Sequence, residues 1–329
     1  MQDKNYNHIE ISIVVPIYNE RETLPRLYQE IKKSLMDDLG NYEIIFVDDY
    51  SDDNSLEFIK KLKEQDGKVE YLSFSRNFGH QTAISAGLNV VKGKFVVVMD
   101  GDLQDPPSLI PHFYRKMREG FEVVYGVRTK RKENIFKRIC YKGFYYIVNK
   151  MSTFYIPRDS GDFCIMSRKV VNYINQLPEK ERFVRGLRAW VGFKQVGIHY
   201  ERGGRYQGES KYSFIKLLEL AFNGIVSFSD IPLKAIIYLG FAVTLLGVCG
   251  ILILLGLLLF TNVHIEARGW TSMLLIILLL SGIQISILGI VGFYITKIFI
   301  ETKRRLPYVI RDSSIKDIRT KQFEYYTDY

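Results

Sequence analysis

The sequence predicts an α/β protein with a Rossmann-like, mostly parallel sheet, followed by a hairpin of two membrane-spanning helices. Three observations lead to this fold class. Short apolar runs alternate with helical patterns through the first part of the chain, which is typical of a parallel sheet. Two long uncharged runs follow them. Polar clusters come directly after several of the short runs, where ligands of such sheets bind.

The predicted strands are nearly continuous in their apolar character, which suits a sheet that is buried on both faces. They span residues 10–18, 42–49, 69–75, 94–100 and 121–128. Helical patterns lie between and after them at residues 23–39, 55–65, 80–91 and 107–119. Residues 1–210 are therefore expected to form one globular domain.

The second part of the chain carries the membrane prediction. Runs 235–260 and 271–296 have 26 residues each and no charge. As helices they would be about 39 Å long, enough to cross a hydrocarbon core of ~30 Å. Lysines and arginines flank the outer ends, whereas the connecting loop carries only Glu266 and Arg268. The positive-inside rule then places the globular domain and both termini in the cytosol, in a multi-pass protein of the inner (cytoplasmic) membrane.

The predicted organisation is completed by segments next to these spans. Residues 211–231 are expected to form a juxtamembrane amphipathic helix, and residues 232–300 the two spans, at about 235–260 and 271–298. Residues 301–329 would be a cytosolic tail. Residues 135–151 also mix aromatic and basic side chains, as helices in the membrane interface do, although ordinary packing against the globular core would need the same pattern.

Net charge is +9 and the isoelectric point about 9.2, which suits either a nucleic acid or a membrane surface as partner. The basic residues cluster at 128–142 and 303–305, beside the apolar segments. This placement favours anionic lipid headgroups over nucleic acid. The three cysteines are scattered, without a paired motif, which fits a reducing compartment.

Several common motifs are missing from the sequence. No GxGxxG turn follows the first predicted strand, and no GxxxxGK[ST] loop occurs, which disfavours dinucleotide binding and P-loop chemistry. HExxH and GxSxG are also absent, which disfavours a zinc protease and a serine hydrolase of those types.

The stretch VVVMDGDLQDPP, residues 96–107, holds the strongest chemical signal. Asp100 and Asp102 stand two residues apart at the end of a predicted strand, so both carboxylates can face one ligand. A divalent cation would relieve their repulsion, and hard oxygen ligands suit Mg²⁺ or Mn²⁺ shared with substrate phosphates. The alternative is a polar turn without a ligand. Asp105 precedes the prolines that begin a helix and is expected to cap it.

Six motifs carry a family resemblance because they occur in order along the chain. They are VVPIYNE (14–20), DDYSDD (48–53), DGDLQDPP (100–107), GVR (126–128), DSGDF (159–163) and RYQGESKY (205–212). With these motifs the chain resembles the inverting family-2 glycosyltransferases with a GT-A fold. More narrowly it resembles polyprenyl-phosphate glycosyltransferases of the bactoprenol glucosyltransferase type and, more distantly, dolichol-phosphate mannose synthase.

The resemblance implies a role for each matching residue. A nucleoside pocket would be lined by Pro16, Tyr18, Glu20, Asp48 and Asp49. The metal and the donor diphosphate would be held by Asp100, Asp102 and Gln104, with Arg205, Ser210 and Lys211 closing over the diphosphate. The acceptor phosphate would be gripped by Arg128 and Arg138, and Asp162 or Asp159 would lie near the reacting centre. Tyr50 departs from relatives, which often carry a small residue there.

The implied reaction moves a hexose, expected to be glucose from UDP-glucose, onto polyprenyl (undecaprenyl) phosphate with inversion, for the modification of a cell-surface or cell-wall glycan. Resemblance also implies a homo-oligomer, a tetramer. One alternative is a processive polysaccharide synthase, which would need a QxxRW element and more spans than this chain offers; its Arg188-Ala189-Trp190 matches poorly. The other is a non-enzymatic lipid-binding scaffold with idle aspartates.

Overall fold

The computed structural model divides the chain into two compact units. The first contains residues 1–140, 154–211 and 304–329, and the second contains residues 141–153 and 212–303. The structure describes residues 9–35, 41–129, 160–180, 182–201, 269–303 and 305–316, with five isolated helical residues between 238 and 249.

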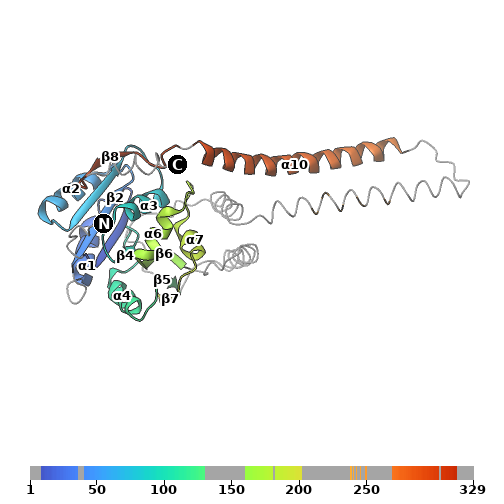
Figure 1. Ribbon diagram of the computed structural model, residues 1–329. Coiled ribbons are helices and arrows are strands. Elements are labelled where there is room, and N and C mark those ends of the chain that lie inside the picture. Colours follow the sequence, from blue (N-terminus) through green and yellow to red (C-terminus); the bar gives the residue numbers. More distant parts are fainter. Residues whose placement is uncertain are drawn as a thin grey trace, which may run out of the picture. The chain divides into compact units, whose positions relative to one another are not determined.

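One eight-stranded sheet forms the centre of the first unit, in the order β7-β5-β6-β4-β1-β2-β3-β8 (Figure 1). The central strands β4, β1, β2 and β3 run parallel, as do β5 and β7, whereas β6 and β8 run antiparallel to their neighbours. The prediction of an α/β fold with a mostly parallel sheet is confirmed. The strands are β1 (Ile11–Ile17), β2 (Tyr42–Asp48), β3 (Val69–Phe74), β4 (Phe95–Val98), β5 (Val123–Arg128), β6 (Ser160–Ser167), β7 (Gln195–Tyr200) and β8 (Ile310–Ser313).

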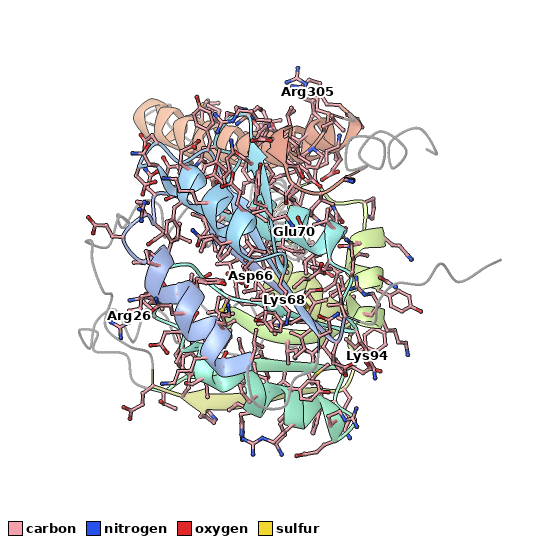
Figure 2. All side chains as sticks on the ribbon, turned by 90° about the vertical axis from the view of Figure 1, so that its left-hand side faces the viewer. Arg26, Asp66, Lys68, Glu70, Lys94 and Arg305 are labelled. Carbon is pink, nitrogen blue, oxygen red and sulfur yellow. The ribbon has the colours of Figure 1, made fainter. Side chains whose placement is uncertain are left out.

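Helices cover both faces of this sheet. On one face α1, α2 and α4 bury their apolar stripes, and Leu27, Ile31 and Phe113 are fully buried there. On the other face lie α3, α6 and α7. Charged side chains such as Arg26 and Lys94 point away from the sheet (Figure 2). The helices are α1 (Leu24–Leu35), α2 (Ser55–Gln65), α3 (His80–Val90), the 3₁₀ turn η1 (Pro107–Leu109), α4 (Ile110–Arg118), α6 (Arg168–Gln176) and α7 (Val184–Trp190).

All five predicted strands are present, each within two residues of its predicted ends, and so are the four helical segments as far as the structure describes them. Beyond β5, the alternation of apolar runs and helical patterns predicted no further strand of the sheet. There β6 reverses direction to pair with both β4 and β5, and α6 and α7 separate it from β7. The DSGDF motif is thus partly a strand: β6 begins at Ser160.

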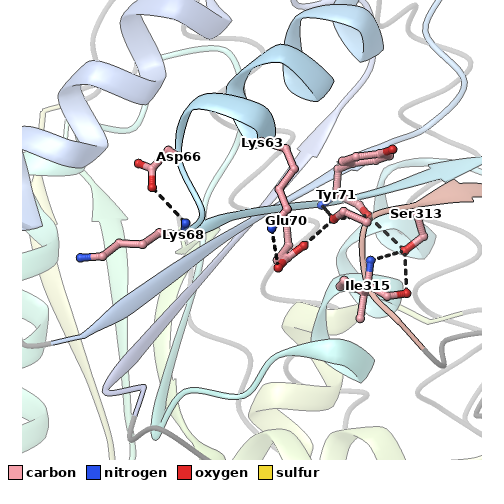
Figure 3. A network of polar contacts seen from close by, with 8 residues as sticks. Lys63, Asp66, Lys68, Glu70, Tyr71, Ser313 and Ile315 are labelled. Carbon is pink, nitrogen blue, oxygen red and sulfur yellow. Dashed lines mark hydrogen bonds and ion pairs between the residues drawn. The ribbon is translucent and has the colours of Figure 1, made fainter.

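The predicted C-terminal tail contributes the edge strand β8, which sequence reasoning missed. It pairs antiparallel with β3. Around it, the Ser314 hydroxyl donates to Glu70, and the Tyr71 N–H donates to the Ser314 oxygen at 2.8 Å. Figure 3 shows the neighbouring contact, in which the Ser313 hydroxyl lies 3.3 Å from the Tyr71 carbonyl oxygen. The Lys60 ammonium lies 2.8 Å from the Asp312 carboxylate. The described part of the tail around β8 is therefore an integral part of the globular sheet.

Helix α10 (Trp270–Thr302) is the described part of the predicted membrane region. Within it, the segment Leu280–Thr302 is long and apolar enough to cross a membrane, with a mean hydropathy of 1.9. It corresponds to the second predicted span. The first span falls outside the described residues except for five isolated helical positions, and so do segment 135–151 and the predicted amphipathic helix 211–231.

Candidate active site

The candidate site is built on the loops that follow the carboxyl ends of the parallel strands β1, β2 and β4. These ends lie side by side, since β1 pairs with both β2 and β4. The loops after β1 and β2 are tied together by backbone donors: the Asn19 N–H donates to the Ser51 hydroxyl at 3.0 Å, and the Glu20 N–H to the Ser55 hydroxyl at 3.1 Å. Asn19 and Tyr50 both adopt positive φ angles, 57° and 66°. The polar clusters therefore meet at one edge, as the topology requires.

The two aspartates at the carboxyl end of β2, Asp48 in the strand and Asp49 just after it, have different roles. Asp48 is fully buried and accepts hydrogen bonds from the Ser73 hydroxyl at 2.8 Å and the Ser51 N–H at 3.1 Å. Asp49 accepts from the backbone N–H groups of Phe78 at 2.7 Å and Gly79 at 2.9 Å. Burial raises the pKa of Asp49, and these two donors only partly oppose the rise. Asp49 thereby fixes the loop that leads from β3 into α3.

The other residues predicted for the nucleoside pocket lie at the end of β1. Pro16 is buried in the strand, and Tyr18 just beyond it is 46% exposed. The Glu20 carboxylate accepts from the Thr23 hydroxyl at 2.9 Å, and the same hydroxyl lies 3.2 Å from the Gly101 carbonyl oxygen. Thr23 therefore links the loop after β1 to the carboxylate-rich loop after β4.

A cluster of three side chains lies beside that loop. The Nε2 atom of His80 is 3.3 Å from the Asp100 carboxylate and 3.6 Å from the Asp162 carboxylate. Asp162 also faces the Arg185 guanidinium at 3.3 Å and accepts from the Gln81 amide at 3.1 Å. The residues come from the loop after β4, from β6 and from the helices α3 and α7, so separate parts of the chain converge here.

The charges of the cluster explain its electrostatics. Burial disfavours a charged imidazole, but the hydrogen bonds and charges of Asp100 and Asp162 outweigh this and raise the pKa of His80 to about 10. Burial would also raise the pKa of Asp162. The charge of Arg185 and the hydrogen bond and charge of His80 outweigh this effect and hold the pKa of Asp162 well below its usual range. Asp162 is therefore an ionised acceptor at neutral pH, and a weak base.

The cluster also fits a divalent cation. One ligand atom from each of His80, Asp100 and Asp162 can lie within 4.8 Å of the others. Carboxylate oxygens suit Mg²⁺ and Mn²⁺. Asp102, the other predicted ligand, accepts from the Gln104 backbone N–H at 3.1 Å and is not among these three residues. The geometry thus brings one of the two predicted metal ligands together with two residues that were not predicted as ligands.

Arg128 ends β5, and its guanidinium faces Asp105 at 3.8 Å and the Tyr200 hydroxyl at 3.5 Å. The expectation that Asp105 caps the next helix is wrong. No side chain caps η1, and Asp105 is fully buried, where it accepts a hydrogen bond from Tyr200. A buried charge demands a partner more strongly than an exposed helix start does.

Some predicted residues lie outside the described part of the chain: Asp159, Arg138, Arg205, Ser210 and Lys211. Conversely, sequence reasoning missed His80, Gln81 and Arg185 as neighbours of Asp162. A signal existed for the first two, since His80 opens the helix after β3 and therefore lies at the ligand-binding edge of the sheet. Nothing in the sequence pointed to Arg185, because α7 was not predicted.

The sequence of this chain is similar to the sequences of known proteins. The model of glycosyl transferase family 2 matches residues 12–174. YkcC of Bacillus subtilis, an uncharacterized glycosyltransferase, is 46% identical over 93% of this chain and 94% of its own. The chain belongs to glycosyltransferase family 2. Another family member, the bactoprenol glucosyl transferase of Shigella phage SfV, is 38% identical over 94% of this chain and 100% of its own.

Among solved structures, this family 2 enzyme is similar to glucosyl-3-phosphoglycerate synthase from Mycobacterium tuberculosis, in a complex with Mn²⁺, UDP and glucosyl-3-phosphoglycerate. The TM-score is 0.45 and the identity 17%, over 67% of this chain and 78% of that one. Staphylococcus aureus TarS in complex with UDP-GlcNAc gives a TM-score of 0.42 at 14% identity, over 68% of each chain.

Proposed function

We propose that this family 2 glycosyltransferase moves glucose from UDP-glucose to polyprenyl phosphate at the cytoplasmic face of the membrane, with inversion at the sugar. One observation carries the proposal. Relatives named bactoprenol glucosyl transferase are 38–39% identical over at least 92% of this chain and 98% of their own. The similarity therefore extends beyond the sheet domain into the apolar region.

The chemistry of this reaction suits the described residues. A phosphate oxygen of the acceptor attacks the anomeric carbon, the bond from that carbon to the donor diphosphate breaks, and UDP leaves. The attacking oxygen is already anionic near neutral pH, so a strong base is unnecessary. Asp162 is then free to remain ionised beside Arg185, as its lowered pKa favours. In this proposal Asp162, or Asp159, organises charge near the reacting centre.

The main difficulty is to bring two anions together. Asp100, Asp102 and Gln104, with Asp162 and His80 close by, would hold Mg²⁺ or Mn²⁺ against the donor diphosphate. A bound cation would supply charge neutralisation for the leaving diphosphate. On the acceptor side Arg128 and Arg138 would offset the phosphate, since guanidinium groups form paired hydrogen bonds to phosphate oxygens. Preorganised charges of this kind are often the largest catalytic contribution.

The nucleoside would lie over the ends of β1 and β2, against Pro16, Tyr18, Glu20 and Asp49. Asp48 would support this wall from beneath, through its bonds to Ser73 and Ser51. Arg205, Ser210 and Lys211 would close over the diphosphate.

A two-span hairpin with both ends in the cytosol completes the proposal. It is supported by β8, which follows α10 in the chain yet joins the same sheet as β1–β7. The chain between β7 and β8 must therefore cross a membrane an even number of times or not at all. With α10 as one span, the uncharged run 235–260 is the natural second one.

The direct test incubates membranes containing the protein with a panel of radiolabelled nucleotide sugars, with and without Mg²⁺ or Mn²⁺. We expect label from UDP-glucose in a lipid extract, with a β-linked sugar phosphate, only when a divalent cation is present. Asp102→Ala should abolish labelling while leaving membrane insertion intact. Undiminished transfer in the presence of a chelator would contradict the metal assignment, and label from another nucleotide sugar would correct the donor.

A further inference from the structure

Beneath the candidate acceptor arginine lies a buried pair formed by Asp105 and Tyr200. Asp105 is 0% exposed, and one of its carboxylate oxygens accepts a hydrogen bond from the Tyr200 hydroxyl. Its other oxygen faces the Arg128 guanidinium at 3.8 Å. A carboxylate without access to water needs such partners, because burying an uncompensated charge is costly. The three side chains therefore form one unit.

The hydroxyl of Tyr200 is held in a fixed position. Tyr200 ends β7 directly beside Arg128 on β5, since the two residues are register partners in the parallel pair. Its ring is 6% exposed and meets the Phe163 ring edge-on, with centroids 6.1 Å apart. Gly126 leaves room for the ring, because a Cβ atom there would lie 2.6 Å from it. The protein interior thus determines where the hydroxyl points.

Arg128 is held on one side by this pair. Its Nε lies 3.5 Å from the Tyr200 hydroxyl, and its side chain is 18% exposed. The guanidinium also packs over Gly161, where a Cβ atom would approach within 3.0 Å. A guanidinium has five N–H donors in a fixed plane, so contacts along one edge leave donors on the other edges for a phosphate. Burial and the Asp105 charge raise the pKa of Tyr200, so that its hydroxyl stays protonated and donates.

We propose that Asp105 and Tyr200 are positioning residues, which fix the Arg128 guanidinium for the phosphate of the acceptor. This inference rests on the proposed function, in which Arg128 binds that phosphate. An arginine that is already ordered loses less side-chain entropy when it binds an anion. Asp105 also belongs to the same loop as Asp100 and Asp102, so one loop would serve both the cation on the donor side and the arginine on the acceptor side.

The decisive experiment is a double-mutant cycle of Tyr200→Phe and Arg128→Ala, read out as binding of a short-chain polyprenyl phosphate to the full-length protein in detergent. Tyr200→Phe removes only the hydroxyl and should weaken acceptor binding about tenfold, with UDP affinity unchanged. In the Arg128→Ala background the same substitution should have little further effect, because residues that act through one another are not additive. In turnover assays of Tyr200→Phe, the KM for the acceptor should rise more than kcat falls.

Tyr28→Phe is the matched control, since the Tyr28 hydroxyl also donates to an aspartate, Asp66, at 2.6 Å, but on the α1–α2 side of the sheet. It should leave acceptor binding unchanged. Thermal unfolding of every variant separates misfolding from a binding defect; if Tyr200→Phe unfolds, Asp105→Asn replaces it in the cycle. If the two substitutions weaken acceptor binding additively, only the positioning role is overturned. The same holds if Tyr200→Phe binds the acceptor normally while Arg128→Ala does not. Normal acceptor binding by Arg128→Ala would overturn the proposed acceptor site and this inference with it.

Discussion

At the scale of single residues, Asp49 shows how one buried carboxylate organises a binding loop. It accepts from two successive backbone N–H groups, of Phe78 and Gly79, just before α3 begins at His80. Gly79 has a φ of 100°, a conformation that favours glycine. The loop between β3 and α3 is therefore anchored by Asp49, a residue of the proposed nucleoside pocket, and it leads directly to His80, which lies beside Asp100 and Asp162.

We expect Asp49→Asn to weaken binding of UDP at least about fivefold. The substituted amide presents a donor to one of the two backbone N–H groups, and a buried donor without an acceptor costs about 1–3 kcal/mol. Isothermal titration of the detergent-solubilised protein with UDP and Mn²⁺ measures this loss. Asp52→Asn, in the same loop but with an exposed side chain, is the control and should bind UDP normally. If the parent protein and both variants bind UDP with equal affinity, Asp49 is not part of the pocket.

His80 supplies the second prediction at this scale. Because its Nε2 atom can approach a common point with oxygens of Asp100 and Asp162, we expect His80→Ala to raise the Mn²⁺ concentration for half-maximal transfer about tenfold. The measurement is a Mn²⁺ titration of transfer activity at saturating donor. If instead His80 only offsets the two carboxylates when no cation is present, its removal would lower the required concentration, contrary to this prediction.

At the scale of elements, the sequence predicted those strands whose apolar runs are buried on both faces. All seven residues of β1 and of β2 are buried, which is why hydropathy alone delimits them. The edge strand β8 could not be found in this way. It has four residues, IRDS, of which Arg311 is exposed, and it exists because β3 offers free edge positions for pairing. Its formation depends on a tertiary contact with β3. The position of Asp105 likewise depends on a tertiary contact, with Tyr200, and not on the helix that follows it.

The ion pair between Asp312 and Lys60 gives β8 a testable pH dependence. The hydrogen bond to Lys60 lowers the pKa of Asp312, so its stabilising effect is present above the pKa of an unfolded aspartate, about 3.9, and is lost as the pH falls through the lower folded value. We expect Asp312→Asn to speed hydrogen exchange of residues 305–316 at pH 7. The change should correspond to less than about 1 kcal/mol in the free energy of local opening, since the pair is partly exposed. The difference from the parent protein should shrink towards pH 3.

The control for this prediction is Glu57→Gln. The Glu57 carboxylate also lies near the Lys60 ammonium, at 3.9 Å, but this ion pair joins two residues of the same helix, α2. Its replacement should leave exchange in the tail unchanged at both pH values. A difference between Asp312→Asn and the parent protein that does not shrink as the pH falls from 7 to 3 would show that the carboxylate charge is not the cause.

At the scale of the whole molecule, the two units follow different physical rules. In the sheet domain the positions of the described site residues depend on contacts far apart in sequence, such as the buried hydrogen bond of Asp105 with Tyr200. In the apolar region the signal is simple composition, so hydropathy predicted the long apolar helix α10 directly. The sequence could therefore indicate which loops carry the site, but not which side chains in them meet.

Because β8 returns to the sheet of β1, the two termini of the membrane region lie on one side of any membrane that it crosses. In a variant whose native cysteines are replaced by alanine, we expect Glu266→Cys to react with a membrane-impermeant maleimide added outside intact cells. Lys316→Cys, in the exposed tail next to β8, should react only after the cells are opened. Transfer activity of both variants confirms a native arrangement. Reaction of both cysteines from outside, or of neither, would contradict a hairpin whose ends lie in the cytosol.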